Sequence, residues 1–101
     1  MTIEELQENY RRNRLLLEEE EDTIRTFQHK GENMLEQAEE RLKQSLSGLD
    51  CDNEALMYAK RAYQLAEAQY QDTLATERRQ IHQKLDDLER EYHTACRHLT
   101  E

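Results

Sequence analysis

The chain has 101 residues, 37% of them charged, with two glycines, two cysteines and no proline or tryptophan. This length allows one domain at most, and two cysteines do not suggest a disulfide scaffold. The net charge of -9 is spread evenly, with 7 basic and 12 acidic residues in 1–49 and 7 and 11 in 50–101. We therefore expect no nucleic-acid binding. Without an apolar run of membrane length or a signal peptide, we expect a cytoplasmic protein with no membrane insertion.

The first half of the chain predicts one helix over residues 3–46. Its apolar residues recur at steps of three, four and seven, which is typical of a coiled-coil seam. Alternation of apolar and polar residues, the mark of a strand, is not visible. The stripe consists of Ile3, Leu6, Tyr10, Leu17, Ile24, Phe27, Leu35, Ala38, Leu42, Leu46 and Leu49.

A turn is predicted over residues 47–52. Gly48 can end the first helix because glycine adopts the left-handed conformation without strain. Asp50, Asp52 or Asn53 can cap the N-terminus of the next helix. The turn motif is Leu46, Gly48, Leu49 and Asp50.

Residues 53–99 predict the second helix, and a turn near residue 50 would pair it antiparallel with the first. Tyr10 would then face Tyr92, and Phe27 would face Leu74. The sequence thus predicts an all-α fold, a two-helix antiparallel coiled-coil hairpin forming one domain over residues 1–101. The second stripe is Leu56, Ala59, Tyr63, Ala66, Tyr70, Leu74, Ile81, Leu85, Leu88, Tyr92, Ala95 and Leu99.

Both stripes leave the three-four alternation once, at Phe27–Gly31–Leu35 and at Tyr70–Leu74, and the pairing places these stutters side by side. Gly31 would lie opposite Tyr70. The missing side chain could admit the tyrosine ring, or the glycine could merely weaken the helix by about 1 kcal/mol; the sequence leaves both open. The stripes also predict three polar residues on the seam, namely Asn13, Glu20 and Glu77.

A hairpin with a single seam buries too little apolar surface to offset readily the conformational entropy of about 100 ordered residues. We therefore expect it to complete a four-helix bundle, with a helical partner protein or with a second copy of itself. A further apolar stripe could make that contact, although it could also be only the edge of a wide core. The predicted partner-binding residues are Met34, Met57, Tyr58, Ala62, Leu65 and Ala68.

Few residues suggest chemistry. His93 and Cys96 share a helix face, but His98 is badly placed for the same ion and no further ligand is convincing, so we expect no metal site. No phosphate-binding loop, nucleophile elbow or zinc-protease motif is present, and the carboxylates lie on open helix faces. We expect neither an enzyme nor a cofactor. The hairpin would hold Cys51 and Cys96 too far apart for a disulfide within the chain, which leaves a link between chains open.

The Leu46-Ser47-Gly48 turn followed by Asp50, between two long helices in about a hundred residues, resembles the WXG-type helical hairpins of bacterial type VII secretion. Leucine stands where that family has tryptophan. The chain is most similar to the small helical adaptors associated with LXG toxins. The three-residue motif is short, whereas the likeness in length and architecture covers nearly the whole chain.

This resemblance implies a non-enzymatic adaptor or targeting chaperone that binds the helical N-terminal domain of a toxin, beside a sister hairpin, before export. It leaves open whether the adaptor is secreted with its client. The family's export signal, an aromatic residue followed four residues later by an acid beyond the second helix, is missing. Tyr63 and Glu67 have that spacing but lie within the helix. The alternative is a structural homodimeric coiled coil without a client.

Overall fold

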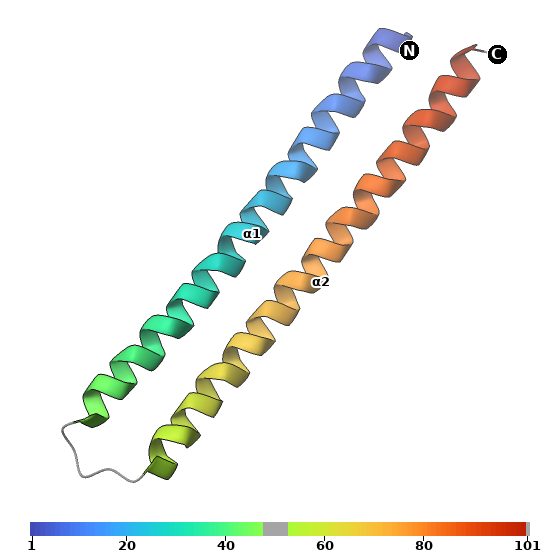
Figure 1. The fold of residues 1–101 in the computed structure, drawn as a ribbon. Helices are drawn as coiled ribbons and strands as arrows, with labels where there is room; N and C mark the ends of the chain where they lie inside the picture. Colours follow the sequence, from blue (N-terminus) through green and yellow to red (C-terminus); the bar gives the residue numbers. More distant parts are fainter. Residues whose placement is uncertain (48–52, 101) are drawn as a thin grey trace. The chain divides into compact units, whose positions relative to one another are not determined.

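A computed structural model describes residues 1–47 and 53–100, which form two α-helices and no strand (Figure 1). Helix α1 spans Ile3–Ser47 and helix α2 spans Asn53–Thr100. The all-α class is confirmed, and each observed helix extends one residue beyond its predicted C-terminal end. Leu46 lies half-buried in the last turn of α1, whereas Gly48, Leu49, Asp50 and Cys51 lie outside the described residues.

The N-terminus of α1 is capped by Thr2. The hydroxyl of Thr2 accepts a hydrogen bond from the backbone N–H of Glu5 at 3.1 Å, and its carbonyl accepts one from the N–H of Leu6 at 3.0 Å. These bonds satisfy two of the donors that a helix leaves free at its first turn. At the other end of the sequence, Arg97 and His98 lie in the last turn of α2, where the helix dipole favours positive charge.

The helices form two compact units. Unit 1 consists of Met1–Ile24 and Thr76–Glu101, and unit 2 consists of Arg25–Ala75. In each unit a stretch of α1 lies beside a stretch of α2 that runs in the opposite direction (Figure 1). The Tyr10 and Tyr92 rings stack in unit 1 with centroids 4.2 Å apart. This contact confirms the predicted pairing of Tyr10 with Tyr92 in unit 1.

The seam of unit 2 keeps a three-four alternation over residues 28–42 of α1 and 67–74 of α2, so neither predicted stutter is present. Phe27, Tyr63 and Tyr70 remain 45%, 41% and 38% exposed, because they lie beside the seam and not on it. Polar residues such as Gln28, Glu67 and Gln71 take the seam positions instead. Two α-helices in a coiled coil stay in contact only through positions that repeat every 3.5 residues. The more buried positions include Gln28, Gly31, Leu35, Ala38 and Leu42 on α1 and Glu67, Gln71 and Leu74 on α2.

Hydrogen bonds accommodate the polar seam of unit 2. The Gln71 side-chain amide donates to the backbone carbonyl of Gln28 at 3.0 Å and to Glu67 Oε1 at 2.6 Å. The Tyr70 hydroxyl donates to the backbone carbonyl of Phe27 at 3.1 Å. The bonds to the Gln28 and Phe27 carbonyls link the two helices, and all three bonds limit the desolvation cost of polar atoms at a helix interface.

A side chain at position 31 would collide with the ring of Tyr70 on the other helix. A Cβ built on Gly31 would lie 2.6 Å from Tyr70 Cε1 and 2.9 Å from Tyr70 Cδ1, well inside van der Waals contact. The structure thus decides between the two interpretations of this residue, because the absent side chain makes room for the Tyr70 ring.

Unit 1 has the same seam pattern and contains a charged cluster. Glu21, with its side chain only 15% exposed, contacts Arg78 Nη2 at 3.4 Å and His82 Nε2 at 3.1 Å. The predicted polar seam residues Asn13, Glu20 and Glu77 are exposed. That prediction was wrong, because the polar seam positions belong to neighbouring residues such as Glu21.

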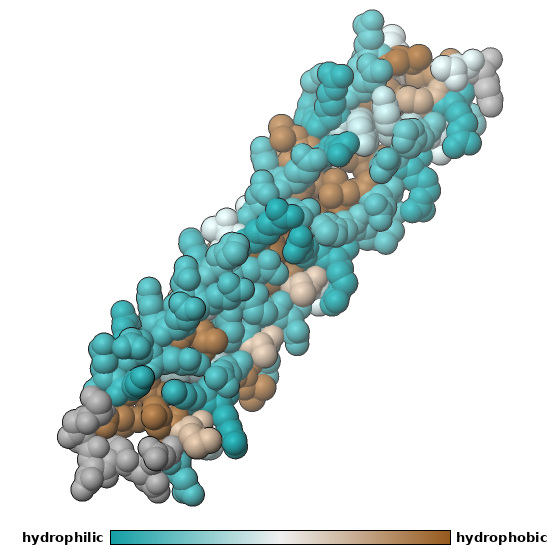
Figure 2. All heavy atoms as spheres, viewed as in Figure 1, coloured by the Kyte–Doolittle hydropathy of each residue, from teal (hydrophilic) through white to brown (hydrophobic). Residues whose placement is uncertain are grey.

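Few apolar side chains are well buried. Among the described residues, Ile24 and Ile81 in unit 1 and Leu74 in unit 2 have exposures of 6%, 5% and 8%. On the face shown in Figure 2, hydrophobic side chains occur in patches between hydrophilic ones. Nowhere in residues 1–47 and 53–100 does a helix combine the length and apolarity needed to cross a membrane.

Candidate partner-binding site

An apolar groove runs along one side of unit 2. It has a volume of about 330 Å³ and is open to solvent. Both helices contribute walls, and small residues from each helix leave the space between larger side chains. The lining residues are Gly31, Met34, Leu35 and Ala38 from α1 and Tyr63, Ala66, Glu67 and Tyr70 from α2.

Large apolar side chains in the groove remain accessible. Met34 is 68% exposed, and the Tyr63 and Tyr70 rings are about two-fifths exposed. A methionine adapts its shape to different neighbours, and tyrosine combines an apolar ring with a polar tip. This combination is typical of surfaces that bind another protein.

The charge along the groove differs from that of the whole chain. Lys30 precedes Met34 by four residues and Arg41 follows it by seven, so both lie on the groove side of α1. The Lys30 ammonium lies 5.7 Å from the centroid of the Phe27 ring. The acidic residues of α1 in this unit occupy other faces. These are Glu32, Glu36, Glu39 and Glu40.

The α2 wall of the groove contributes one acid, Glu67. Its Oε1 accepts the short hydrogen bond from Gln71, and its side chain is half-buried. The exposed edge of this wall consists of uncharged residues such as Ala66 and Tyr70. The groove is therefore apolar with a positively charged border, in a chain whose net charge is -9.

The structure brings only one predicted partner-binding residue into the groove, Met34. Tyr58, Ala62 and Leu65 share a face of α2 that points away from the seam, because each residue advances about 100° around the helix. Tyr58 and Leu65 are 79% and 62% exposed there. Met57 and Ala68 are also exposed and do not line the groove.

Sequence reasoning missed the groove because Tyr63, Ala66 and Tyr70 were assigned to the buried seam. The strict alternation through Glu67, Gln71 and Leu74 is the signal that would have moved these residues to its edge. Selecting seam positions by hydrophobicity alone concealed that pattern.

Unit 1 has a second hollow, with a volume of about 430 Å³. Leu16, which is 54% exposed, contributes to it together with the half-buried Leu17 and Leu88. We call it the leucine surface. Its complete lining is Asn13, Leu16, Leu17, Glu20, Lys84, Asp87, Leu88 and Glu91.

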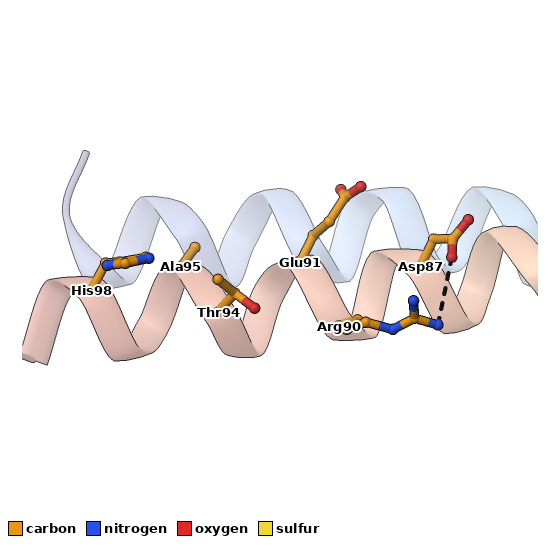
Figure 3. Close-up of a pocket in the computed structure, with 6 residues that line it drawn as sticks. All are labelled: Asp87, Arg90, Glu91, Thr94, Ala95 and His98. Atoms are coloured by element: carbon orange, nitrogen blue, oxygen red, sulfur yellow. Dashed lines mark ion pairs between the residues drawn. The ribbon is translucent and has the colours of Figure 1, made fainter.

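The acidic border of the leucine surface continues along α2. Asp87 and Glu91, one helical turn apart, also line a neighbouring hollow of about 380 Å³ whose labelled side chains all come from α2 (Figure 3). Arg90 Nη2 lies 3.7 Å from Asp87 Oδ1, and the Gln83 side chain donates to the same oxygen at 3.0 Å. The border thus keeps an excess of acids over its one lysine, Lys84.

The residues considered for metal binding do not gather. His93 Nε2 lies 3.6 Å from Glu89 Oε1 on the same exposed helix face. Across the described part of the chain, no group of three or more histidine, cysteine, aspartate or glutamate residues could hold a metal ion. Cys96 is half-buried near Tyr92, and its hydrogen bond to the phenol, followed by burial, raises the pKa of Tyr92 above its ordinary 10.0.

Comparison of the chain with protein families, curated proteins and solved structures finds no match.

Proposed function

We propose that this chain is a non-enzymatic helical adaptor that binds an α-helix of a partner protein in the groove of unit 2. The open apolar groove is the observation that supports this proposal. Its walls come from two antiparallel helices that lie side by side, and a third helix can pack between them with its side chains directed into the space above Gly31 and Ala66.

Burial energetics favour such a partner. Leu74 is the single apolar residue described in unit 2 with an exposure below a tenth. Covering the exposed parts of Met34, Tyr63 and Tyr70 would contribute about 2–4 kcal/mol, from roughly 1.5–3 kcal/mol for each fully buried side chain. This gain is a substantial fraction of the net stability of a small domain, which is usually about 5–15 kcal/mol.

The charges specify the partner helix further. Lys30 and Arg41 border the groove on α1, while the α2 edge opposite is uncharged. A matching helix presents large apolar residues with acidic residues along one edge, because opposite charges across an interface favour association and orientation. A basic helix would be disfavoured.

The resemblance of the turn sequence to WXG-type hairpins suggests a specific partner, the helical N-terminal domain of an LXG toxin. In this proposal the adaptor binds the toxin in the cytoplasm before type VII secretion, and the partner carries the export signal. A large toxin gene beside the gene for this chain would support the assignment, and its absence would contradict it.

Co-expression with that toxin domain tests the proposal. The wild-type chain is expected to co-purify with it in a fixed stoichiometry, measured by light scattering after size exclusion. Met34→Glu combined with Ala66→Glu should abolish the complex, because both place charge in the groove. Leu65→Glu, on the opposite side of α2, is the matched control and should preserve it.

Two results would count against this proposal. Loss of the complex with Leu65→Glu alone would transfer partner binding to the Tyr58–Leu65 face. Absence of any complex with the wild-type chain would reject the toxin domain as the partner. Helical circular dichroism of each variant checks that the substitutions leave the fold intact.

A further inference from the structure

The groove and the leucine surface have opposite electrostatic borders. The groove of unit 2 is bordered by Lys30 and Arg41, and its one acid, Glu67, is held by Gln71. The leucine surface of unit 1 carries three acids and one lysine around its apolar centre. One chain therefore presents both an apolar surface with a positive border and one with a negative border.

We infer that the leucine surface of one copy occupies the groove of a second copy. Leu16 is more than half exposed and projects from a helix, and the groove is bounded by the small residues Gly31, Ala38 and Ala66. An exposed leucine beside small residues allows close helix packing. The acids beside it then approach Lys30 and Arg41, which orients the two copies.

Contacts between identical surfaces are less favourable. Placing two grooves together would bring Lys30 and Arg41 of one copy toward the same residues of the other. Placing two leucine surfaces together would oppose their acidic borders. Like charges facing each other across an interface disfavour the arrangement, so the contact between unlike surfaces is selected.

The positive border is also a poor site for an anionic polymer or membrane. Only two cations border the groove, whereas the chain as a whole has a net charge of -9. Long-range repulsion from that charge opposes nucleic acids and anionic lipids. A second copy has the same net charge, but it also brings exposed apolar side chains such as Leu16, whose burial in the groove opposes this repulsion.

Because the two surfaces lie on different units, each copy can both offer a leucine surface and accept one. Reciprocal contacts give a closed dimer, and one-sided contacts give a chain of copies. If the proposed function is correct, a client helix competes with the second copy for the same groove. Self-association itself does not depend on that function.

Sedimentation equilibrium of the full chain tests the inference. We expect concentration-dependent association of the 12.2 kDa chain. Lys30→Glu with Arg41→Glu, and separately Glu20→Lys with Glu91→Lys, should each weaken association at least tenfold. An equimolar mixture of the two double variants should restore it, since each reversed groove then meets a reversed leucine surface.

The matched control is Lys43→Glu with Arg61→Glu, which makes the same charge change at exposed positions of unit 2 away from the groove. It should leave association within about twofold of the wild type, allowing for long-range charge effects. A monomer at every concentration would overturn the inference. So would a dimer that Leu65→Glu dissolves while both charge-reversed double variants preserve it. Neither result decides whether the chain binds a toxin domain, because the co-expression experiment measures that binding separately.

Discussion

Replacing Gly31 by alanine tests the closest approach between the two helices. In an exposed helix this substitution usually stabilises by about 1 kcal/mol, because glycine is a poor helix former. Here the new Cβ would lie 2.6 Å from Tyr70 Cε1 and 3.1 Å from Gln71 Nε2. Reaching an ordinary contact of about 3.5–4.0 Å requires the ring to move by about 1 Å.

Moving the ring has a cost that exceeds the gain in helix propensity. The displaced ring gives up the hydrogen bond from its hydroxyl to the Phe27 carbonyl, worth about 0.5–1.5 kcal/mol. Overpacking adds strain, and the total cost of such insertions is typically about 1–3 kcal/mol. Subtracting the propensity gain leaves Gly31→Ala destabilising by about 1 kcal/mol.

A double-mutant cycle isolates this contact. In a Tyr70→Ala background the ring is absent, so Gly31→Ala should stabilise the folded state by up to about 1 kcal/mol. The coupling between the two positions should therefore be about 2 kcal/mol, measured by urea denaturation followed by circular dichroism at one protein concentration. If Gly31→Ala stabilises the wild-type protein as much as the Tyr70→Ala variant, the steric explanation is wrong.

Three further predictions concern unit 1. Ile81→Ala should destabilise by about 2–4 kcal/mol because it leaves a cavity at a buried position, whereas Leu15→Ala, at a side chain that is 56% exposed, should change stability by less than about 1 kcal/mol in thermal unfolding. Replacing Glu21 and Arg78 together by leucine should stabilise the fold by about 1 kcal/mol, as measured by urea denaturation. Arg78→Leu alone should destabilise it, because Glu21 then loses one cationic partner. Equal changes in the free energy of unfolding for the single and the double variant would show that the ion pair is energetically unimportant. The raised pKa of Tyr92 means that its neutral form is favoured in the folded state, so its contribution to stability is present below pH 10 and is lost as pH rises above it. The absorbance difference between wild type and Tyr92→Phe should titrate above pH 10, and Cys96→Ala should lower that midpoint, since the bond to Cys96 is the largest cause of the shift; an unchanged midpoint would remove Cys96 as the cause.

The fold could be predicted from sequence because two signals agreed. Proline-free stretches with three-four periodicity predicted both helices to within one residue at their ends, and the position of the turn predicted the pairing of Tyr10 with Tyr92. Helix boundaries and antiparallel register depend mainly on such local and periodic features.

The exact seam in unit 2 could not be predicted from hydrophobicity. Phe27 and Tyr70 are more apolar than Gln28 and Gln71, yet the glutamines take the seam positions. The 3.5-residue period of a helix pair decides which positions face the partner helix, and the hydrogen bonds of Gln71 make a polar residue acceptable there. Tyr70, displaced to the edge, then becomes a wall of the groove.

The candidate site was predicted only in part for the same reason. Met34 was correctly placed at an accessible apolar surface, but whether it binds a partner stays a prediction. Leu65 and Tyr58 form a separate face of α2. Comparing the groove variants with Leu65→Glu will show whether the partner binds in the groove or on this face. Which small residues create a hollow depends on the residues across the interface, and a single helix sequence does not contain that information.

The fit of Tyr70 against Gly31 also limits mechanical motion in unit 2. If α1 slid along α2 by one heptad, Tyr70 would meet Ile24 or Ala38, and both have a Cβ where the ring needs space. Signals in some helical proteins travel as such piston-like displacements. Longitudinal slippage past this glycine is therefore disfavoured by the same contact with the Tyr70 ring that disfavours Gly31→Ala.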